Sequence, residues 1–301
     1  MASKRPAFDC ITLETPADLK PLMGHWRTSA YLKQRRLRLR NPEQLSRFLY
    51  KYRGFSGEYA EQNLRDMIVY SVLRLSAHAT FNDPYEMVVH IVVDGTPEQR
   101  LERFSQIVAE RGPPAPPDRR VEMVRLLMER PDSEHVERCQ ESLARIRQQS
   151  GVFCFAGDPR CVLMWSHYAE NHHGVCLQFE RMKDFPTLGH AVRVEYRDDL
   201  PTVNWIVGFL DVMREMLLTK HPSWDYEKER RITSIDHANR YLQLRPDALT
   251  GIIFGCRTQK PQMELIDKLL AERKALGVPP VKTYVATQHK TKYRLVIRRR
   301  D

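Results

Sequence analysis

The chain lacks the sequence signatures of several large enzyme classes. It contains no G-x-x-x-x-G-K-[ST] phosphate loop, no G-x-G-x-x-G dinucleotide loop, no G-x-S-x-G nucleophile turn and no H-E-x-x-H metal motif. These absences argue against Walker-type NTPases, dinucleotide-binding Rossmann enzymes, α/β-hydrolases and zincins.

Long apolar runs and paired cysteines are absent as well. The sequence has no stretch of eighteen apolar residues, and its first residues, MASKRPAFDC, lack the apolar centre of a secretory signal. The six cysteines form no C-x-x-C pair, which favours reduced thiols in a core over a disulfide framework or a zinc ribbon. We therefore expect a cytoplasmic protein that has no membrane segment and uses its cysteines for packing.

The chain does have an ordinary globular composition with an excess of positive charge. Hydrophobic residues make up 42% and charged residues 29% of the 301 residues. A net charge of +10 suggests a phosphate-bearing partner, either a nucleotide or a nucleic acid. Much of the excess lies in YLKQRRLRLR (31–40) and TKYRLVIRRRD (291–301). The first of these fits a nucleic-acid-binding arm, but its alternation also fits an element with a solvated face.

The order of patterns indicates an α+β fold. Residues 1–47 are interpreted as a basic N-terminal arm, and residues 48–301 as a single domain with a helical insert at about 96–150, interrupted by the loop GPPAPPD. Short strands dominate after residue 150 without strict alternation with helices, which predicts a mixed or largely antiparallel sheet with flanking helices. Helices are predicted over 132–151, 202–220 and 259–277.

The segment CVLMWSHYAENHHGVCLQFE (161–180) is unusually rich in polar and aromatic side chains. Asp158 and Pro159 read as the N-cap and first residue of a helix over 159–171. Within it, Trp165 lies on a stripe typical of a core, whereas the polar side chains lie on other faces. Its histidines and cysteine match no common zinc spacing, so no metal site is predicted.

Two further segments carry clustered polar residues. FNDPYE (81–86) predicts a tight turn whose side chains bond the backbone, and the turn can also direct Asp83 and Glu86 toward a cleft. In WDYEKERRI (224–232), Glu227 and Glu229 lie two positions apart at a strand entrance, where they would share one face. With the arginines that follow, they form either a surface ladder of ion pairs or a site that stabilises positive charge on a sugar.

Several of these segments, taken in order, resemble the bacterial domain-of-unknown-function family 2971. The resemblance rests on LYKYRG (49–54), FNDPYE, the MWSHYAENHHGVC element and the W-x-Y-E-x-E-x-R element, and it extends from residue 48 to residue 256. Ala156 departs from it, since a serine is expected there. The family name implies no activity.

The order of elements is also similar to that of ADP-ribosyltransferases. An early strand there carries NAD-binding residues, a middle strand and helix carry aromatic or hydroxyl residues at the nicotinamide, and a late strand carries a catalytic glutamate. The similarity implies that NAD is consumed as a substrate. It assigns catalytic roles to Glu229, Glu227 and His167. It assigns cofactor binding to residues from all of these segments: Tyr50, Lys51, Arg53, Asn82, Asp83, Trp165, Ser166, Tyr168 and Arg231.

Three functions therefore remain open. The first is an NAD-consuming ADP-ribosyltransferase-like enzyme in bacterial toxin or phage-defence biology. The second is a metal-dependent nuclease that uses Asp83, Glu86, His167 and Glu227. The third is a non-catalytic module that binds nucleic acid or a nucleotide. For the first function we expect LYKYRG, FNDPYE, SHY and YEKE to converge on one site.

Overall fold

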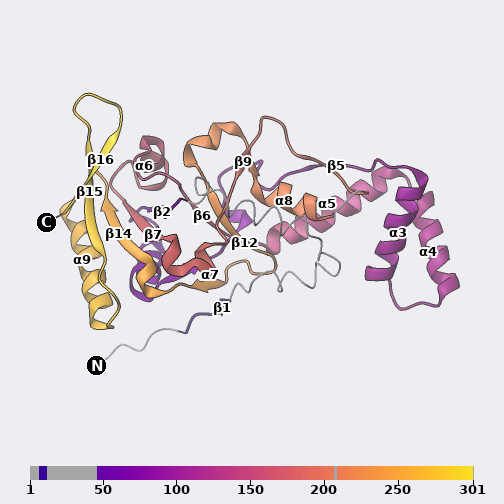
Figure 1. Cartoon of the computed structure of the whole chain (residues 1–301), viewed down its shortest axis with the longest axis horizontal. Helices are drawn as coiled ribbons and strands as arrows, with labels where there is room; N and C mark the ends of the chain where they lie inside the picture. The colour runs from indigo at the N-terminus through magenta and orange to yellow at the C-terminus, as the bar shows by residue number, and fades with distance from the viewer. Residues whose placement is uncertain (1–6, 12–45, 207–208, 301) are drawn as a thin grey trace. The chain divides into compact units, whose positions relative to one another are not determined.

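A computed structural model of the chain describes residues 7–11, 46–206 and 209–300, and it divides into two compact units (Figure 1). The first unit comprises the described residues up to Ala77 together with Gly151–Val194 and the residues from Ser223 onward. The second comprises His78–Ser150 and Glu195–Pro222. The basic segment 31–40 of the predicted arm lies outside the described residues.

The largest sheet of the first unit is mixed. Its strand order is β16-β15-β14-β7-β2, with β14 and β15 parallel and the other neighbours antiparallel. The strands are β2 (Phe48–Arg53), β7 (Val175–Glu180), β14 (Leu249–Phe254), β15 (Lys282–Gln288) and β16 (Leu295–Arg299). Strands β2, β14 and β15 are rich in β-branched or aromatic residues, and a glycine or proline lies close to one end of each. This composition is typical of strands.

A second, antiparallel sheet has the order β4-β6-β12-β8. Its strands are β4 (Ser76–Ala77), β6 (Gly151–Phe155), β8 (Val192–Arg193) and β12 (Arg230–Ser234). Tyr50 and Ala156 exchange two backbone hydrogen bonds, which attach the middle of β2 to the end of β6. A small third sheet consists of β1 (Cys10–Ile11), β13 (Tyr241–Gln243) and β3 (Val72–Arg74).

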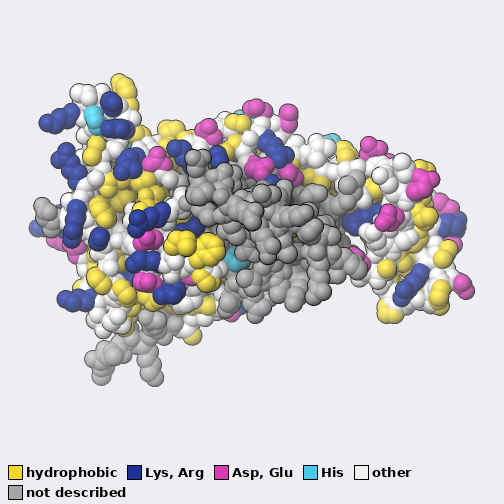
Figure 2. All heavy atoms as spheres, in the orientation of Figure 1, with side chains coloured by type: hydrophobic (Ala, Val, Ile, Leu, Met, Phe, Trp, Pro, Cys, Tyr) yellow, Lys and Arg dark blue, Asp and Glu magenta, His cyan; other side chains and the backbone are white. Residues whose placement is uncertain are grey.

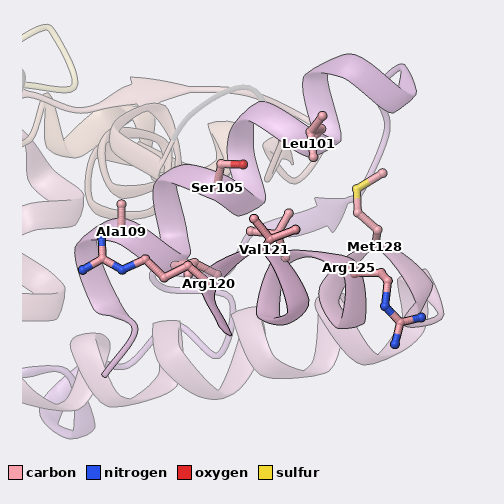
Figure 3. Close-up of a pocket in the computed structure, with 9 residues that line it drawn as sticks. Leu101, Ser105, Ala109, Arg120, Val121, Arg125 and Met128 are labelled. Carbon is pink, nitrogen blue, oxygen red and sulfur yellow. The ribbon is translucent and has the colours of Figure 1, made fainter. Parts of the chain in front are cut away.

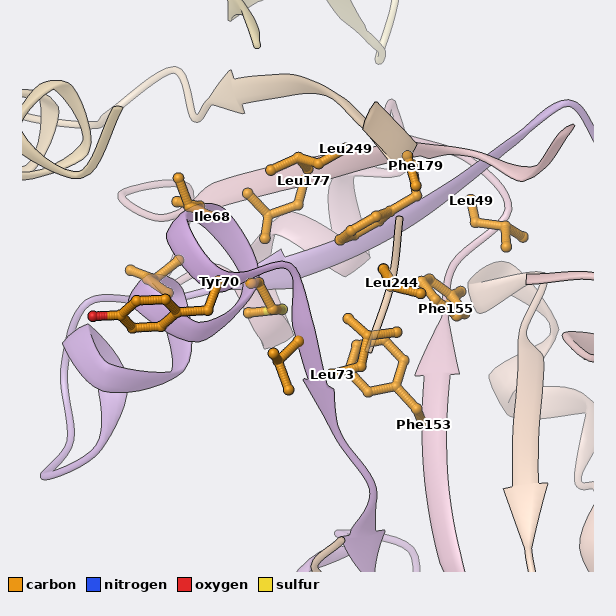
Figure 4. Close-up of a cluster of buried hydrophobic side chains, with 14 of the residues drawn as sticks. Leu49, Ile68, Tyr70, Leu73, Phe153, Phe155, Leu177, Phe179, Leu244 and Leu249 are labelled. Carbon is orange, nitrogen blue, oxygen red and sulfur yellow. The ribbon is translucent and has the colours of Figure 1, made fainter. Parts of the chain in front are cut away.

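Helices complete the core of this unit. They are α2 (Ala60–Arg65), which continues into a π-helix (Asp66–Tyr70), then α6 (Val162–Tyr168), α7 (Phe185–Leu188) and α9 (Lys260–Ala275). The main apolar cluster takes side chains from the π-helix and from both sheets, with Ile68, Phe155 and Leu177 among its members (Figure 4). A second cluster surrounds Trp165 and Tyr52.

The second unit is mostly helical. It contains α3 (Pro97–Arg111), α4 (Pro117–Glu129), α5 (Asp132–Gln149) and α8 (Phe209–Leu218), with two short parallel pairs, β5 (His90–Val92) with β10 (Thr202–Asn204) and β9 (Glu195–Tyr196) with β11 (Thr219–Lys220). Thr96 and Gln99 form a reciprocal capping box at the start of α3. The ring of His135 stacks on those of Phe104 and Trp205.

The structure confirms the α+β class and the mixed sheet, and it corrects two predicted helices. The helix expected over 159–171 spans only Val162–Tyr168, because the carboxylate of Asp158 accepts the Arg160 N–H in a local turn rather than capping a helix. The helix expected over 202–220 begins later, because Thr202–Asn204 is a strand. In the part of the chain that is described, no helix combines the length and hydropathy needed to cross a membrane.

Candidate functional site

Strand β2 presents two different faces. Tyr50 and Tyr52 lie on the face that packs into the Trp165 cluster, where the Tyr52 hydroxyl donates to the Asp158 carbonyl at 2.6 Å. Burial raises the pKa of Tyr50 to about 12. Because side chains alternate along a strand, Lys51 and Arg53 lie on the opposite face. The strand therefore delivers its two cations to one side of the sheet.

Lys51 is held against β6. Its Nζ donates to the Cys154 carbonyl at 2.8 Å and lies 4.6 Å from the centre of the Phe153 ring. Burial, and then repulsion by Arg53, lower the pKa of Lys51 to about 8, although the nearby carboxylates of Glu229 and Glu227 oppose that shift. An ammonium group with a pKa this low is able to exchange a proton near neutral pH.

The two carboxylates reach the same region by an unexpected route. Glu227 ends a 3-10 helix (Pro222–Glu227), Lys228 adopts a left-handed conformation with φ 45°, and β12 begins only after Glu229. The prediction that both glutamates share a strand face is therefore wrong, because the left-handed residue interrupts the alternation. Both side chains are nevertheless buried, at 4% and 3% exposure.

Glu229 forms a bidentate ion pair with Arg231. The Arg231 Nε lies 2.7 Å from Oε1 of Glu229, and the second guanidinium contact is 3.0 Å. Cys154 is the cross-strand partner of Arg231. Burial raises the pKa of the Cys154 thiol, and the charge of Glu229 raises it further. The thiol is therefore protonated at neutral pH and is no nucleophile.

Glu227 accepts a hydrogen bond from the middle segment of the sequence, residues 161–180. The phenol of Tyr168, at the end of α6, donates to Oε1 of Glu227 at 2.6 Å. The neighbouring His167 is exposed, and its ring lies 6.1 Å from that of Tyr226. The contact between Tyr168 and Glu227 joins two of the segments that the sequence analysis singled out.

Other polar residues of the middle segment support the fold. Trp165 is fully buried, and its indole N–H donates to the Pro159 carbonyl at 2.9 Å. The Ser166 hydroxyl lies 3.3 Å from Nε2 of His172, whose ring stacks on Trp165. These polar and aromatic side chains therefore stabilise a turn rather than face a ligand.

Arg53 lines a polar cavity of about 290 Å³. Its Nε is buried without a hydrogen-bond partner, and among the described residues no carboxylate forms an ion pair with it. Burial lowers the pKa of Arg53 to about 10. The other lining residues come from the loop after β2 and the start of α2: Gly54, Ser56, Gly57, Glu58, Tyr59, Ala60 and Asn63. A guanidinium in this position is suited to an anionic group of a ligand.

Glu170 holds the loop after β2, which lines the Arg53 cavity. Its carboxylate accepts the backbone N–H groups of Phe55, at 2.9 Å, and of Ser56. At Gly54 an added Cβ would lie 2.6 Å from the Glu170 side chain, so only glycine permits this approach. Gly57, with φ 98°, then reverses the chain toward α2.

The FNDPYE turn belongs to the second unit. The Asp83 carboxylate accepts the Tyr85 N–H at 2.9 Å, which is the predicted turn chemistry. Glu86 is 2% exposed, and its Oε2 lies 3.8 Å from Nζ of Lys220. The structure thus brings together part of the predicted site, namely Lys51 with Arg53, Tyr168, Glu227, Glu229 and Arg231. Tyr50, Trp165, Ser166 and His167 lie elsewhere in the first unit, and Asn82 and Asp83 are part of the second.

A larger cavity, of about 470 Å³, is an apolar groove between α3 and α4 (Figure 3). Its only charged lining residues are Arg120 and Arg125, and Arg125 is paired with Glu122 and Glu129 at 2.7 and 2.6 Å. This groove offers no acid or base for catalysis. Within the described ranges, no group of three or more His, Cys, Asp or Glu side chains is arranged to hold a metal ion.

Sequence reasoning missed two participants. Cys154 was assigned to packing, yet it lies beside Lys51 and Glu229; its place between Phe153 and Phe155 in GVFCF was the available signal, because alternation turns it away from the core. Glu170 was not selected at all. Its reach across 115 positions to Phe55 leaves no local pattern in the sequence.

Comparison with known proteins bears out the family resemblance. Residues 164–232 match the model of the family described as "Protein of unknown function (DUF2971)". The matched segment runs from α6 to β12 and contains Tyr168, Glu227, Glu229 and Arg231. No curated protein and no solved structure matches the chain. The similarity to ADP-ribosyltransferases stays a prediction.

Proposed function

We propose that the chain is an NAD-consuming enzyme, a transferase or glycohydrolase that cleaves the bond between nicotinamide and ribose. One observation carries the proposal. The charges of two buried carboxylates, Glu227 and Glu229, both influence the half-buried Lys51, and this lysine neighbours Arg53, which lines a polar cavity. Buried titratable groups with shifted pKa values beside a cavity are typical of catalytic sites.

The proposed reaction needs a negative charge near the ribose. Nicotinamide leaves as a neutral base with the bonding electrons, so positive charge develops on the ribose carbon and ring oxygen. An acceptor nucleophile or water then bonds to that carbon and loses a proton. A buried carboxylate stabilises this charge mainly in the transition state. Arg53 would bind the pyrophosphate, because a guanidinium can donate two parallel hydrogen bonds to phosphate oxygens.

The geometry favours Glu227 over Glu229 for this role, reversing the order that the sequence alone suggested. Glu229 binds Arg231 through both carboxylate oxygens, at 2.7 and 3.0 Å. Glu227 accepts a hydrogen bond at 2.6 Å from the phenol of Tyr168, in the segment that the similarity to ADP-ribosyltransferases assigns to nicotinamide binding. Glu229 then serves to position Arg231 and Lys51.

The positive charge of the chain supports a phosphate-bearing acceptor or ligand, a nucleotide or nucleic acid. Bacterial toxin or phage-defence biology is the setting proposed for such an enzyme, because consumption of NAD or modification of nucleic acid arrests a cell.

The test is release of nicotinamide from labelled NAD, with and without protein and nucleic-acid acceptors. We expect Glu227→Gln to keep the fold and NAD affinity and to lower turnover at least ~10²-fold. The matched control is Glu264→Gln, which changes an exposed carboxylate on α9 and should leave turnover unchanged. If the unmutated chain releases no nicotinamide above background with any of the acceptors, the proposal is wrong.

A further inference from the structure

The β15–β16 hairpin concentrates positive charge and has no acidic residue of its own. Between residues 282 and 300 the chain has three lysines and four arginines, seven cations in all, and no Asp or Glu. Figure 2 shows Lys and Arg side chains gathered over this hairpin, at the left of the molecule. Only one of the seven has an ion pair among the described residues: Arg300, which contacts Asp267 at 2.8 Å.

The cations at the tip of the hairpin are solvent-exposed. Lys290, Lys292 and Arg294 are all exposed, and Tyr293 between them is fully exposed. The tip nevertheless has a defined backbone, because the His289 N–H donates to the Arg294 carbonyl at 3.0 Å and the Thr291 N–H donates to Nδ1 of His289 at 3.1 Å. It is a small, ordered, basic projection with an aromatic ring.

Protection of a sheet edge explains part of this charge. Strand β16 is at the edge of its sheet, and charged side chains such as Arg298 prevent pairing with another chain. The tip residues lie beyond the last strand pair, Gln288 with Leu295. They have no strand edge to protect, so edge protection does not account for Lys290, Lys292 and Arg294.

We propose that the hairpin tip binds single-stranded nucleic acid. Lys290, Lys292 and Arg294 contact phosphates, and the ring of Tyr293 stacks on a base. A single strand is favoured over a duplex because an exposed ring needs an unstacked base to cover it. This inference rests on the phosphate-bearing partner proposed above and is independent of NAD cleavage.

The experiment measures binding of fluorescent single-stranded DNA and RNA oligonucleotides to the full chain as salt is varied. The triple variant K290Q/K292Q/R294Q should lower the slope of log affinity against log salt by about two, because each lost phosphate contact removes about 0.7. Tyr293→Ala should weaken binding roughly tenfold at constant salt slope, and Tyr293→Trp should retain it. The matched control K183Q/K260Q/K268Q removes three exposed lysines from the same unit and should bind as the unmutated chain does.

Three outcomes would overturn the proposal. One is equal affinity and equal salt slope for the hairpin triple variant and the unmutated chain. The second is duplex binding that is tighter than single-strand binding. The third is binding to vesicles of phosphatidylglycerol without binding to oligonucleotides, which would assign the tip to a lipid surface. Nicotinamide release is scored separately, so a failed NAD assay leaves this result interpretable.

Discussion

Two arginines of the first unit, Arg273 and Arg53, are held in opposite ways. Arg273 on α9 is 1% exposed and donates to the carbonyls of Pro279 at 2.7 Å, Ile68 at 2.5 Å and Pro246. Arg53 at the end of β2 has a buried Nε without a hydrogen-bond partner in the described part of the chain, and its side chain lines a cavity. Burial lowers the pKa of each to about 10.

The difference separates two uses of a buried cation. The guanidinium donors of Arg273 are satisfied by backbone carbonyls, so the desolvation of Arg273 is offset within the fold. The protein does not offset the desolvation of Arg53 in the same way. A bound anion would do so, which is the physical reason to regard the Arg53 cavity as a ligand site and the Arg273 cluster as structure.

The largest expected effect breaks this comparison directly. Arg273→Met should lower the free energy of unfolding by about 4 kcal/mol, because it leaves several buried carbonyls unsatisfied. Arg53→Met, the matched variant, should change it by less than about 1 kcal/mol, because the Arg53 side chain has no hydrogen bond to any of the described residues. Urea unfolding monitored by circular dichroism measures both.

Ligand binding separates the same two variants in the other direction. Arg53→Met should weaken the binding of NAD or pyrophosphate at least tenfold by calorimetry. Equal destabilisation by the two substitutions would contradict the comparison, since it would make Arg53 a structural residue.

Much of this arrangement follows from local sequence patterns, and the rest does not. Helix α5 and the short strands after residue 150 were predicted because helical periodicity and strand alternation are local patterns. The strand Thr202–Asn204 was missed because its partner, β5, is more than a hundred residues away. The order of segments suggested that Lys51 and Glu227 share a site, but the left-handed Lys228 that directs Glu227 there is conformationally rare and has no sequence signal.

The next effect concerns Lys51, whose surroundings are intermediate between those of Arg273 and Arg53. Its ammonium group has one carbonyl partner and two carboxylate neighbours. Its pKa falls from 10.5 to about 8 on folding. Between those pH values the unfolded chain binds a proton that the folded chain does not, so stability rises with pH. Lys51→Met removes this rise, which is on the order of 3 kcal/mol at most.

The measurement is the free energy of unfolding of the unmutated chain minus that of Lys51→Met, from pH 7 to pH 10. The difference should increase steadily above pH 8. Lys183→Met, at an exposed position, is the control and should give a flat difference. A flat difference for Lys51→Met as well would show that Lys51 is charged and solvated in the folded state.

The smallest effect tests the wall of the Arg53 cavity. Burial alone raises the pKa of Glu170, but the hydrogen bonds from Ser56 and Phe55 outweigh it, and the net pKa is below the ordinary value of 4.5. The carboxylate therefore stabilises the fold above pH 4.5, and this contribution is lost as the pH falls through the lowered pKa. Glu170→Gln should cost about 1 kcal/mol at pH 7, because a neutral amide oxygen accepts these bonds more weakly.

The cost of Glu170→Gln should then diminish as the pH falls through this lowered pKa, because the carboxyl group of the unmutated chain itself becomes protonated. Acid and urea titrations of both proteins measure this, with the exposed Glu264→Gln as the reference. Because the same carboxylate holds the loop from Gly54 to Gly57, the substitution should also weaken pyrophosphate binding a few-fold. A pH-independent cost without any change in binding would mean that Glu170 supports the loop by packing and that the Arg53 cavity does not depend on its charge.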